Sequence, residues 1–171
     1  MTSIGPYTES CDMKQMFSFS DYRKPKPPTC YPKNSIMDII SRHPDLTLYS
    51  QIIKKANMDS TLSDSQANFT VFIASDTELK KKYTKEFFDK MDKGTAHQIM
   101  RTSMMNRQID KYLIQSSPSS MLPTMDRSNT LYVNTVDGIT YLPNGISFIH
   151  WNQPATNGLI HIIDDIIKPS I

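Results

Sequence analysis

Long apolar runs, glycines and cysteines are all scarce in this sequence of 171 residues. No apolar stretch approaches the roughly 18 to 20 residues needed to cross a bilayer, so no transmembrane helix is predicted. The opening residues 1–6 carry neither a basic segment nor an apolar one, and no secretory signal is expected. The five glycines form no Walker-type or Gly-x-Gly-x-x-Gly loop, which argues against a nucleotide cofactor.

An excess of charge of one sign is also missing. Lys and Arg number 19 and Asp and Glu number 17, which gives a net charge of +2. Proteins that bind nucleic acid draw much of their affinity from neutralising phosphates and carry a clear basic excess, so nucleic acid is not an expected partner. The run Lys80 to Lys82 lies close to Glu78 and Glu86, a mixture typical of a solvated helix face.

Groups that could share a reaction are not placed together in the sequence. Its four histidines are His43, His97, His150 and His161. They form no i, i+4 pair, and without a Cys-x-x-Cys pair they give little support for a metal site. There is no Gly-x-Ser-x-Gly elbow, and the neighbours Asp164 and Asp165 would point to opposite faces of a strand. We therefore expect no catalytic residue, no metal, no cofactor and no small-molecule ligand.

Proline and both cysteines concentrate in residues 1–33, which carry five of the eleven prolines together with Cys11 and Cys30. Proline fixes φ and has no N–H, so residues 24–28 are predicted to be extended. Five basic and three acidic residues give this segment a charge of +2, whereas residues 34–171 are balanced. The two cysteines either close a loop as a disulfide or stay as free thiols, and the sequence leaves both open.

Residues 1–33 cannot bury enough surface to fold alone, so we expect them to form an extended arm docked on the body of the chain or on a neighbouring subunit. The aromatic and basic side chains expected to contact a protein partner are Tyr7, Phe17, Phe19, Tyr22, Arg23, Lys24, Lys26 and Tyr31. Residues 34–171 are expected to form one globular domain.

The first half of that domain has helical spacing. Asn34 or Ser35 can cap a helix that ends before Pro44, and Asp45 is a possible cap for a second helix over residues 46–53. A buried strand is predicted over residues 69–74, followed by a capping box from Ser75 to Glu78. Helical spacing then continues through residues 79–91 with a break near residue 84, and again from residue 95 to residue 109.

The last third changes period. Strands are predicted over residues 131–136, 139–142 and 146–151, separated by the pairs Asp137-Gly138 and Asn144-Gly145. Such pairs favour type I′ hairpin turns, in which both central residues need a positive φ. Asn157-Gly158 supplies a further tight turn before a strand over residues 159–163. The order of elements predicts an α+β fold in which helices pack on an antiparallel sandwich or wedge.

Two blocks of sequence resemble the fasciclin-like domain family. The first block runs from Thr70 to Leu79 and has Ala74 where the family has proline. The second and more specific block runs from Ala155 to Asp164 and is followed by Pro169. The residues that carry the resemblance are Thr70, Phe72, Ser75, Glu78, Asn157, Gly158, His161 and Asp164. The resemblance covers about residues 34–171.

The resemblance implies structural roles for these residues. His161 is expected to be a core histidine with a backbone or hydroxyl partner. Asp164 is expected to accept hydrogen bonds near Thr70 or Ser75. The Tyr-His pair that family members use in adhesion aligns near residues 102 and 103, which are Thr and Ser here, so that function is not carried over.

The sequence leaves three classes of function to compare. The preferred prediction is a non-catalytic structural protein of a large assembly, such as a minor capsid or cement protein in a virion, anchored to other subunits by its N-terminal arm. The alternative is an extracellular or cell-surface adhesion module that binds matrix protein or glycan. The third class is an enzyme, and nothing in the sequence places two catalytic groups together. The sequon at Asn68 abuts a buried strand and was given no weight.

Overall fold

The computed structural model describes residues 31–116, 118–126 and 130–168. Cys11, Cys30, Pro169 and the predicted arm up to residue 30 lie outside the described residues. The described strands form one seven-stranded sheet in the order β2-β1-β7-β6-β5-β4-β3. The strands are β1 (Phe69–Ala74), β2 (Met104–Met105), β3 (Ser119–Pro123), β4 (Thr130–Val136), β5 (Ile139–Leu142), β6 (Ile146–Ala155) and β7 (Gly158–Ile163).

The two central strands carry the two blocks singled out in the sequence. β1 and β7 pair in parallel from Phe69 opposite Gly158 to Ala74 opposite Ile163, and every residue of both strands is buried. The expectation of a purely antiparallel arrangement was therefore wrong for this pair, and the sheet is mixed. Strands that are buried on both faces read as continuous apolar runs, which contain no period that distinguishes parallel from antiparallel pairing.

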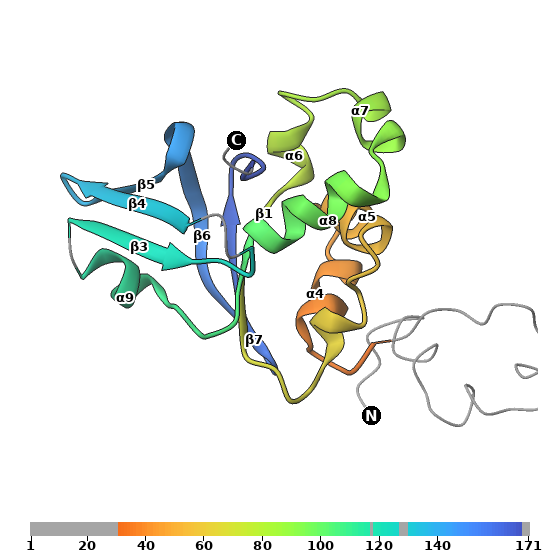
Figure 1. The fold of residues 1–171 in the computed structure, drawn as a ribbon, viewed down its shortest axis with the longest axis horizontal. Coiled ribbons are helices and arrows are strands. Elements are labelled where there is room, and N and C mark those ends of the chain that lie inside the picture. Colours follow the sequence, from red (N-terminus) through yellow and green to blue (C-terminus); the bar gives the residue numbers. More distant parts are fainter. Residues whose placement is uncertain (1–30, 117, 127–129, 169–171) are drawn as a thin grey trace, which may run out of the picture.

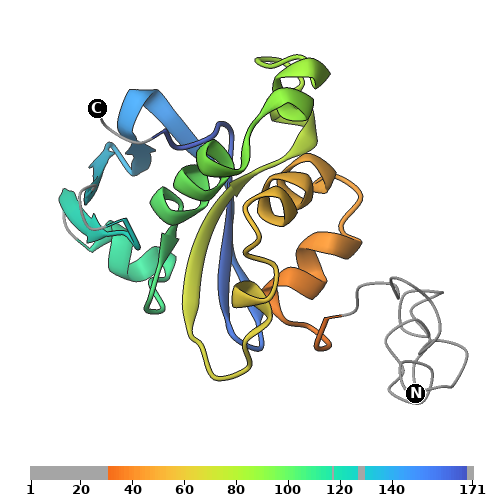
Figure 2. The same cartoon turned by 45° about the vertical axis from the view of Figure 1, so that its right-hand side comes forward.

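Most of the short helices gather around β1 and β7, whereas β3, β4 and β5 extend away on the other side together with the helix that precedes β3 (Figures 1 and 2). The helices are α4 (Ile36–Arg42), α5 (Thr47–Lys55), α6 (Asp76–Leu79), α7 (Lys85–Lys90), α8 (Lys93–Thr102) and α9 (Lys111–Gln115), with the 3₁₀ turns η1 (Thr61–Ser63) and η2 (Pro143–Gly145). The longest of these helices has ten residues, and no described helix is long and apolar enough to cross a membrane.

Side-chain caps set most of the helix starts. Ser35 caps α4, and the predicted break near residue 84 is confirmed, because the Thr84 hydroxyl caps α7 through the Phe87 N–H. The helix predicted from residue 95 begins slightly earlier, after the cap Asp92, and it ends at Thr102. Residues 104 and 105 then form the edge strand β2, so the prediction that this helix continues to residue 109 was wrong.

The predicted hairpin turns are present. Asp137 and Gly138 have φ values of 52° and 79°, and Asn144 and Gly145 have values of 66° and 75°. Both residues of each pair thus lie in the left-handed region. Asp137-Gly138 is the two-residue connection of a type I′ turn, whereas Asn144-Gly145 belongs to a three-residue connection that begins at Pro143. These turns fix the register of β4 with β5 and of β5 with β6.

Two aspartates exchange caps between the start of α5 and the start of α6. The Asp76 carboxylate accepts hydrogen bonds from the Thr47 and Leu48 N–H groups, at 3.2 and 2.8 Å, and from the Thr47 hydroxyl. In return, Asp45 accepts from the Thr77 N–H at 3.1 Å and from its hydroxyl at 2.9 Å. Asp45 therefore does not cap its own helix, as the sequence suggested. It caps the helix that follows β1.

Removing the buried carboxylate should test this exchange. Asp76 is 4% exposed and satisfies several donors at once, so Asp76→Ala should lower the free energy of unfolding by about 2–4 kcal/mol. Asp89→Ala is the matched control, because Asp89 is exposed and its carboxylate accepts a single long hydrogen bond, from the Gln51 amide at 3.3 Å, and it should cost less than about 0.5 kcal/mol. Urea unfolding would measure the free energy of unfolding of both variants. Equal losses would show that the exchanged caps do not stabilise the fold more than an exposed hydrogen bond does.

Candidate functional site

The Asn157 side chain joins three parts of the fold that are distant in sequence. Its amide oxygen accepts from the Ile36 N–H at 2.8 Å, at the start of α4. Its amide nitrogen donates to the carbonyls of Leu62 and Asp64, at 2.9 and 3.1 Å. Its own carbonyl accepts from the Phe69 N–H at 3.0 Å, where β1 begins. Because the side chain is 1% exposed, these backbone groups have no water to replace it.

Gly158 allows β7 to approach β1 closely at the same point. Its φ is +153°, and a Cβ added there would lie 2.0 Å from the Phe69 carbonyl oxygen and 2.9 Å from Ile36 Cδ1. The first contact is with backbone, which cannot swing away as a flexible side chain could. Any other residue at this position must therefore move one of the two central strands.

The two blocks hold one loop between them. The Thr70 hydroxyl, on β1, donates to the Arg107 carbonyl at 2.7 Å and accepts from the Ile109 N–H at 2.8 Å. His161, on β7, binds the Ile109 carbonyl through Nε2 at 2.8 Å. The backbone of Ile109 is thus satisfied on both sides by one residue from each block. No pattern in the sequence indicated that this loop matters, because single contacts to backbone leave no periodicity.

His161 is fully buried, and its hydrogen bonds define its tautomer. Nδ1 accepts from the Asn152 N–H at 3.0 Å, so the ring proton lies on Nε2 and is donated to Ile109. Burial lowers the pKa of His161 below its usual value, and this outweighs the opposing effects of the Ile109 carbonyl and Asp110. Both ring nitrogens are occupied by backbone, which matches a structural core histidine rather than a base.

The remaining block residues also serve the fold. Phe72 pairs with His161 in the register of β1 and β7, and their rings stack with centroids 5.4 Å apart. The Ser75 hydroxyl accepts from the Glu78 N–H at 3.4 Å and caps α6. The Glu78 carboxylate lies 3.2 Å from Lys81 Nζ, and among the described residues it makes no return bond to the Ser75 N–H. Only half of the predicted capping box is therefore present.

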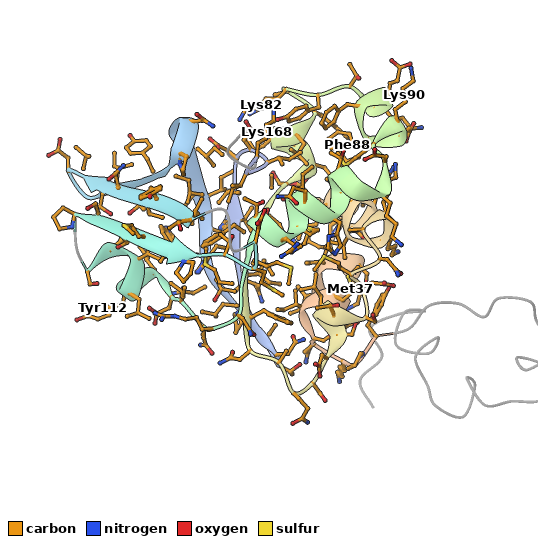
Figure 3. The ribbon with its side chains drawn as sticks, viewed as in Figure 1. Met37, Lys82, Phe88, Lys90, Tyr112 and Lys168 are labelled. Atoms are coloured by element: carbon orange, nitrogen blue, oxygen red, sulfur yellow. The ribbon has the colours of Figure 1, made fainter. Side chains whose placement is uncertain are left out.

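Asp164 does not contact Thr70 or Ser75, so that expectation was wrong. Its Oδ1 accepts from the Ser147 N–H at 3.0 Å, which ties the end of β7 to the start of β6. The neighbouring carboxylate of Asp165 accepts from the Tyr83 hydroxyl at 2.8 Å instead. Lys82 and Lys168 lie at this same end of the molecule (Figure 3), where Lys82 Nζ donates to the Asp164 carbonyl at 2.6 Å.

A group of apolar side chains on β3, β4 and β5 faces solvent, and we call it the outer sheet face. Met121 lies opposite Tyr132, and Val136 lies opposite Ile139. The members are Met121, Tyr132, Val136, Ile139 and Tyr141, with exposed fractions of 65%, 55%, 57%, 53% and 37%. Their sequence neighbours Leu122, Leu131, Val133 and Leu142 point to the opposite side and are buried.

α9 covers the buried side of these strands. The Gln115 amide donates to the Thr140 hydroxyl at 2.8 Å, and the Ser120 hydroxyl donates to the Ile114 carbonyl at 3.4 Å. Tyr112, the most exposed large apolar side chain of the described chain at 78%, projects from α9 at this end of the molecule (Figure 3). The sequence analysis missed the outer sheet face, although the alternation in residues 131–136 and 139–142 carried the signal.

Of the eight side chains expected to contact a partner, only Tyr31 lies within the described residues. Its ring is 7% exposed in the core, and its hydroxyl donates to Asp59 at 3.0 Å, which removes it from a partner-binding set. The Pro32 carbonyl also accepts from the Ser35 N–H at 3.1 Å, so this end of the predicted arm packs with the body. Tyr7, Phe17, Phe19, Tyr22, Arg23, Lys24 and Lys26 lie outside the described residues.

The positions aligned with the family's Tyr-His pair are not on the surface. Thr102 is 3% exposed and Ser103 is fully buried, with its hydroxyl donating to the Ile99 carbonyl at 2.7 Å. Within the described ranges, no group of three or more His, Cys, Asp or Glu is arranged to hold a metal ion.

The Gly158 geometry predicts a severe effect of a single methyl group. Gly158→Ala should lower the free energy of unfolding by about 3 kcal/mol or more, because strain in the backbone adds to a clash with the Phe69 carbonyl. Gly138→Ala is the matched control: its φ is also positive, at +79°, but nothing lies within 4 Å of the added Cβ, and it should cost about 1–2 kcal/mol. Similar losses in urea unfolding would refute the close approach.

The His161 geometry predicts a pH dependence of stability. A lowered folded-state pKa means that the unfolded chain binds a proton more readily, so stability should fall as the pH drops below about 6.5, with a slope of at most about 1.4 kcal/mol per pH unit. His161→Gln should flatten this slope between about pH 7.5 and 5.5. An imidazole NMR titration of His161 with an ordinary midpoint would contradict the prediction.

Known proteins share this architecture. No curated protein sequence matches the chain. Among solved structures, it is similar to a FAS1 domain pair from the insect cell adhesion molecule Fasciclin I, with a TM-score of 0.61, 21% identity and coverage of 80% of this chain. The chain spans about half of that domain pair, 51% of its length, and the likeness shows the fold. The sequence model of the Fasciclin domain family matches residues 44–169, and the chain therefore belongs to that family.

Proposed function

We propose that this chain is a non-catalytic interaction module that binds another protein through its outer sheet face. The observation that carries the proposal is the exposure of five apolar side chains side by side on β3, β4 and β5. Large apolar side chains gathered on one sheet face are unusual on the free surface of a monomeric protein and mark interaction sites. The N-terminal arm is proposed as the second contact element, through the seven side chains outside the described residues.

The chemistry of the outer sheet face favours an apolar protein partner. The other described residues that share it by strand register are Ser119, Pro123, Thr130, Asn134 and Ser147. None of these is charged, so a strongly charged partner would lose hydration there without gaining an ion pair. Tyrosine and methionine are enriched at protein interfaces, which agrees with Tyr132, Tyr141 and Met121.

The polar groups inside the fold support a non-catalytic role. The side chains of Thr70, Asn157 and His161 are buried and form their hydrogen bonds with backbone groups. A hollow of about 510 Å³ is lined by residues 34, 39, 42 and 153–156, and its one ionisable side chain is Arg42, which pairs with Asp38 at 3.2 Å. A second hollow, of about 400 Å³, holds the exposed Glu86–Lys90 pair. The Asp92 carboxylate beside this second hollow accepts from the Thr95 N–H at 2.7 Å as the cap of α8, and neither hollow is lined by a His or Cys side chain.

Two settings fit such a module. The chain could be a structural component of a large assembly, of which a minor capsid or cement protein of a virion is the concrete version predicted from the sequence. The alternative is a cell-surface or extracellular adhesion module, which is favoured by the likeness to a domain pair of a cell adhesion molecule. Both settings use the same face, and they differ in where the bound protein is found.

A charge placed at the centre of the face should abolish binding. In the full-length chain expressed in its native source, Tyr132→Glu should lower recovery in the bound fraction at least about tenfold, because the carboxylate would be buried without a partner. Tyr112→Glu is the matched control, since that tyrosine is also exposed but belongs to α9 on the other side of β3–β5, and it should bind as the unmodified chain does.

Fractionation decides both the function and its setting. Recovery with a sedimenting particle supports the assembly, and recovery with the cell surface or medium supports adhesion. Equal recovery of Tyr132→Glu and the unmodified chain would overturn the proposed function. Circular dichroism and thermal unfolding of each variant show that loss of binding is not loss of folding.

A further inference from the structure

We propose that the outer sheet face of one copy of this chain binds the aromatic segment Phe17–Ser20 of a second copy. This inference rests on the proposed function and names the partner of the same face. It pairs two elements of the chain: an uncharged apolar face on the described body, and the aromatic residues of the N-terminal arm.

The outer sheet face is complementary to a partner that is apolar, nearly uncharged and able to lie across strands. The register places Tyr132 beside Met121 on one side, while Asn134 lies opposite Tyr141 on the other, so the apolar area crosses β3, β4 and β5. Nothing in the described part of the face could pair with a charged side chain. A basic or acidic peptide is therefore a poor match.

The segment has the matching composition. Residues 15–20 read Gln-Met-Phe-Ser-Phe-Ser, and the first charge after them is Asp21. Phe17 and Phe19 alternate with Ser18 and Ser20, and such alternation puts both rings on one side of an extended chain. Of the arm's five basic residues, Lys14 precedes the segment and the other four, from Arg23 onward, follow it, so all of them can stay in solvent.

Reach favours a second copy over the chain's own body. The described chain starts at Tyr31 beside α4, at the end of the molecule opposite β3–β5 in both views (Figures 1 and 2). A body of about 140 residues has a diameter of about 37 Å, so a path around it to the far side is about 58 Å long. An extended chain back from Tyr31 reaches at most about 40 Å at Ser20 and about 50 Å at Phe17. Both fall short.

Mutual exchange of the segment between two copies gives a closed dimer. If each copy gives its segment to the face of the other, two identical contacts form about a twofold axis, and no free face remains to recruit further copies. The two contacts also reinforce each other, because formation of the first raises the local concentration for the second. The expected product is a dimer rather than an open chain of molecules.

Complementation between two full-length variants tests the exchange. The face variant Tyr132→Glu keeps its segment, and the segment variant Phe17→Ser/Phe19→Ser keeps its face. Sedimentation velocity over a concentration series should show a dimer for the unmodified chain and an at least tenfold weaker dimer for each variant alone, by about 1.4 kcal/mol or more. Met13→Ser, in the arm but outside the proposed contact residues, and Tyr112→Glu are the matched controls and should dimerise as the unmodified chain does.

Mixing the two variants gives the decisive result. With a fluorescent label on one of them, the mixture should form a mixed dimer that neither variant forms with itself, because one intact face then meets one intact segment. A mixture that stays monomeric overturns the exchange. So does a segment variant that dimerises normally, which would indicate that the two faces pair directly. If the unmodified chain is monomeric throughout while Tyr132→Glu still loses its native complex, the exchange is wrong and the proposed function stands.

Discussion

The meeting of Asn157 and Gly158 with the start of β1 is the contact on which the rest of the structure depends. At this point β7 comes so close to β1 that a Cβ on residue 158 would lie 2.0 Å from a carbonyl oxygen. The Asn157 amide then fixes the start of α4 and the loop after η1 with three hydrogen bonds. One side chain thereby supplies partners to buried backbone groups on both sides of the central strand pair, which an apolar residue of the same size could not do.

Buried polar groups repeat this logic along the central strands. Thr70 and His161 hold the two sides of the Ile109 backbone, and Asp76 holds the start of α5. In each case one polar side chain replaces a secondary-structure hydrogen bond that an irregular segment cannot make for itself. The donors and acceptors of these side chains are therefore already used inside the fold, and their burial keeps water away from them.

Local features of this fold could be predicted from the sequence, and non-local ones could not. The turn at Asp137-Gly138 and the caps at Ser35, Ser75 and Thr84 depend on residues within four positions of each other, and the structure has all of them. The parallel pairing of β1 with β7 joins residues almost ninety positions apart, and two continuous apolar runs are compatible with either direction. Asp45 was assigned to the nearest helix because proximity in sequence was the only guide.

The outer sheet face was missed for a different reason. Its alternation was visible in residues 131–136, but alternation predicts that one side of a strand is exposed, and normally the exposed side is polar. Here Tyr132, Val136 and Ile139 occupy that side. Leaving them in water gives up the free energy that burial would provide, roughly 1.5–3 kcal/mol for a large apolar side chain. These three side chains remain exposed in the described part of the chain, and the proposed interface would recover part of this free energy by covering them.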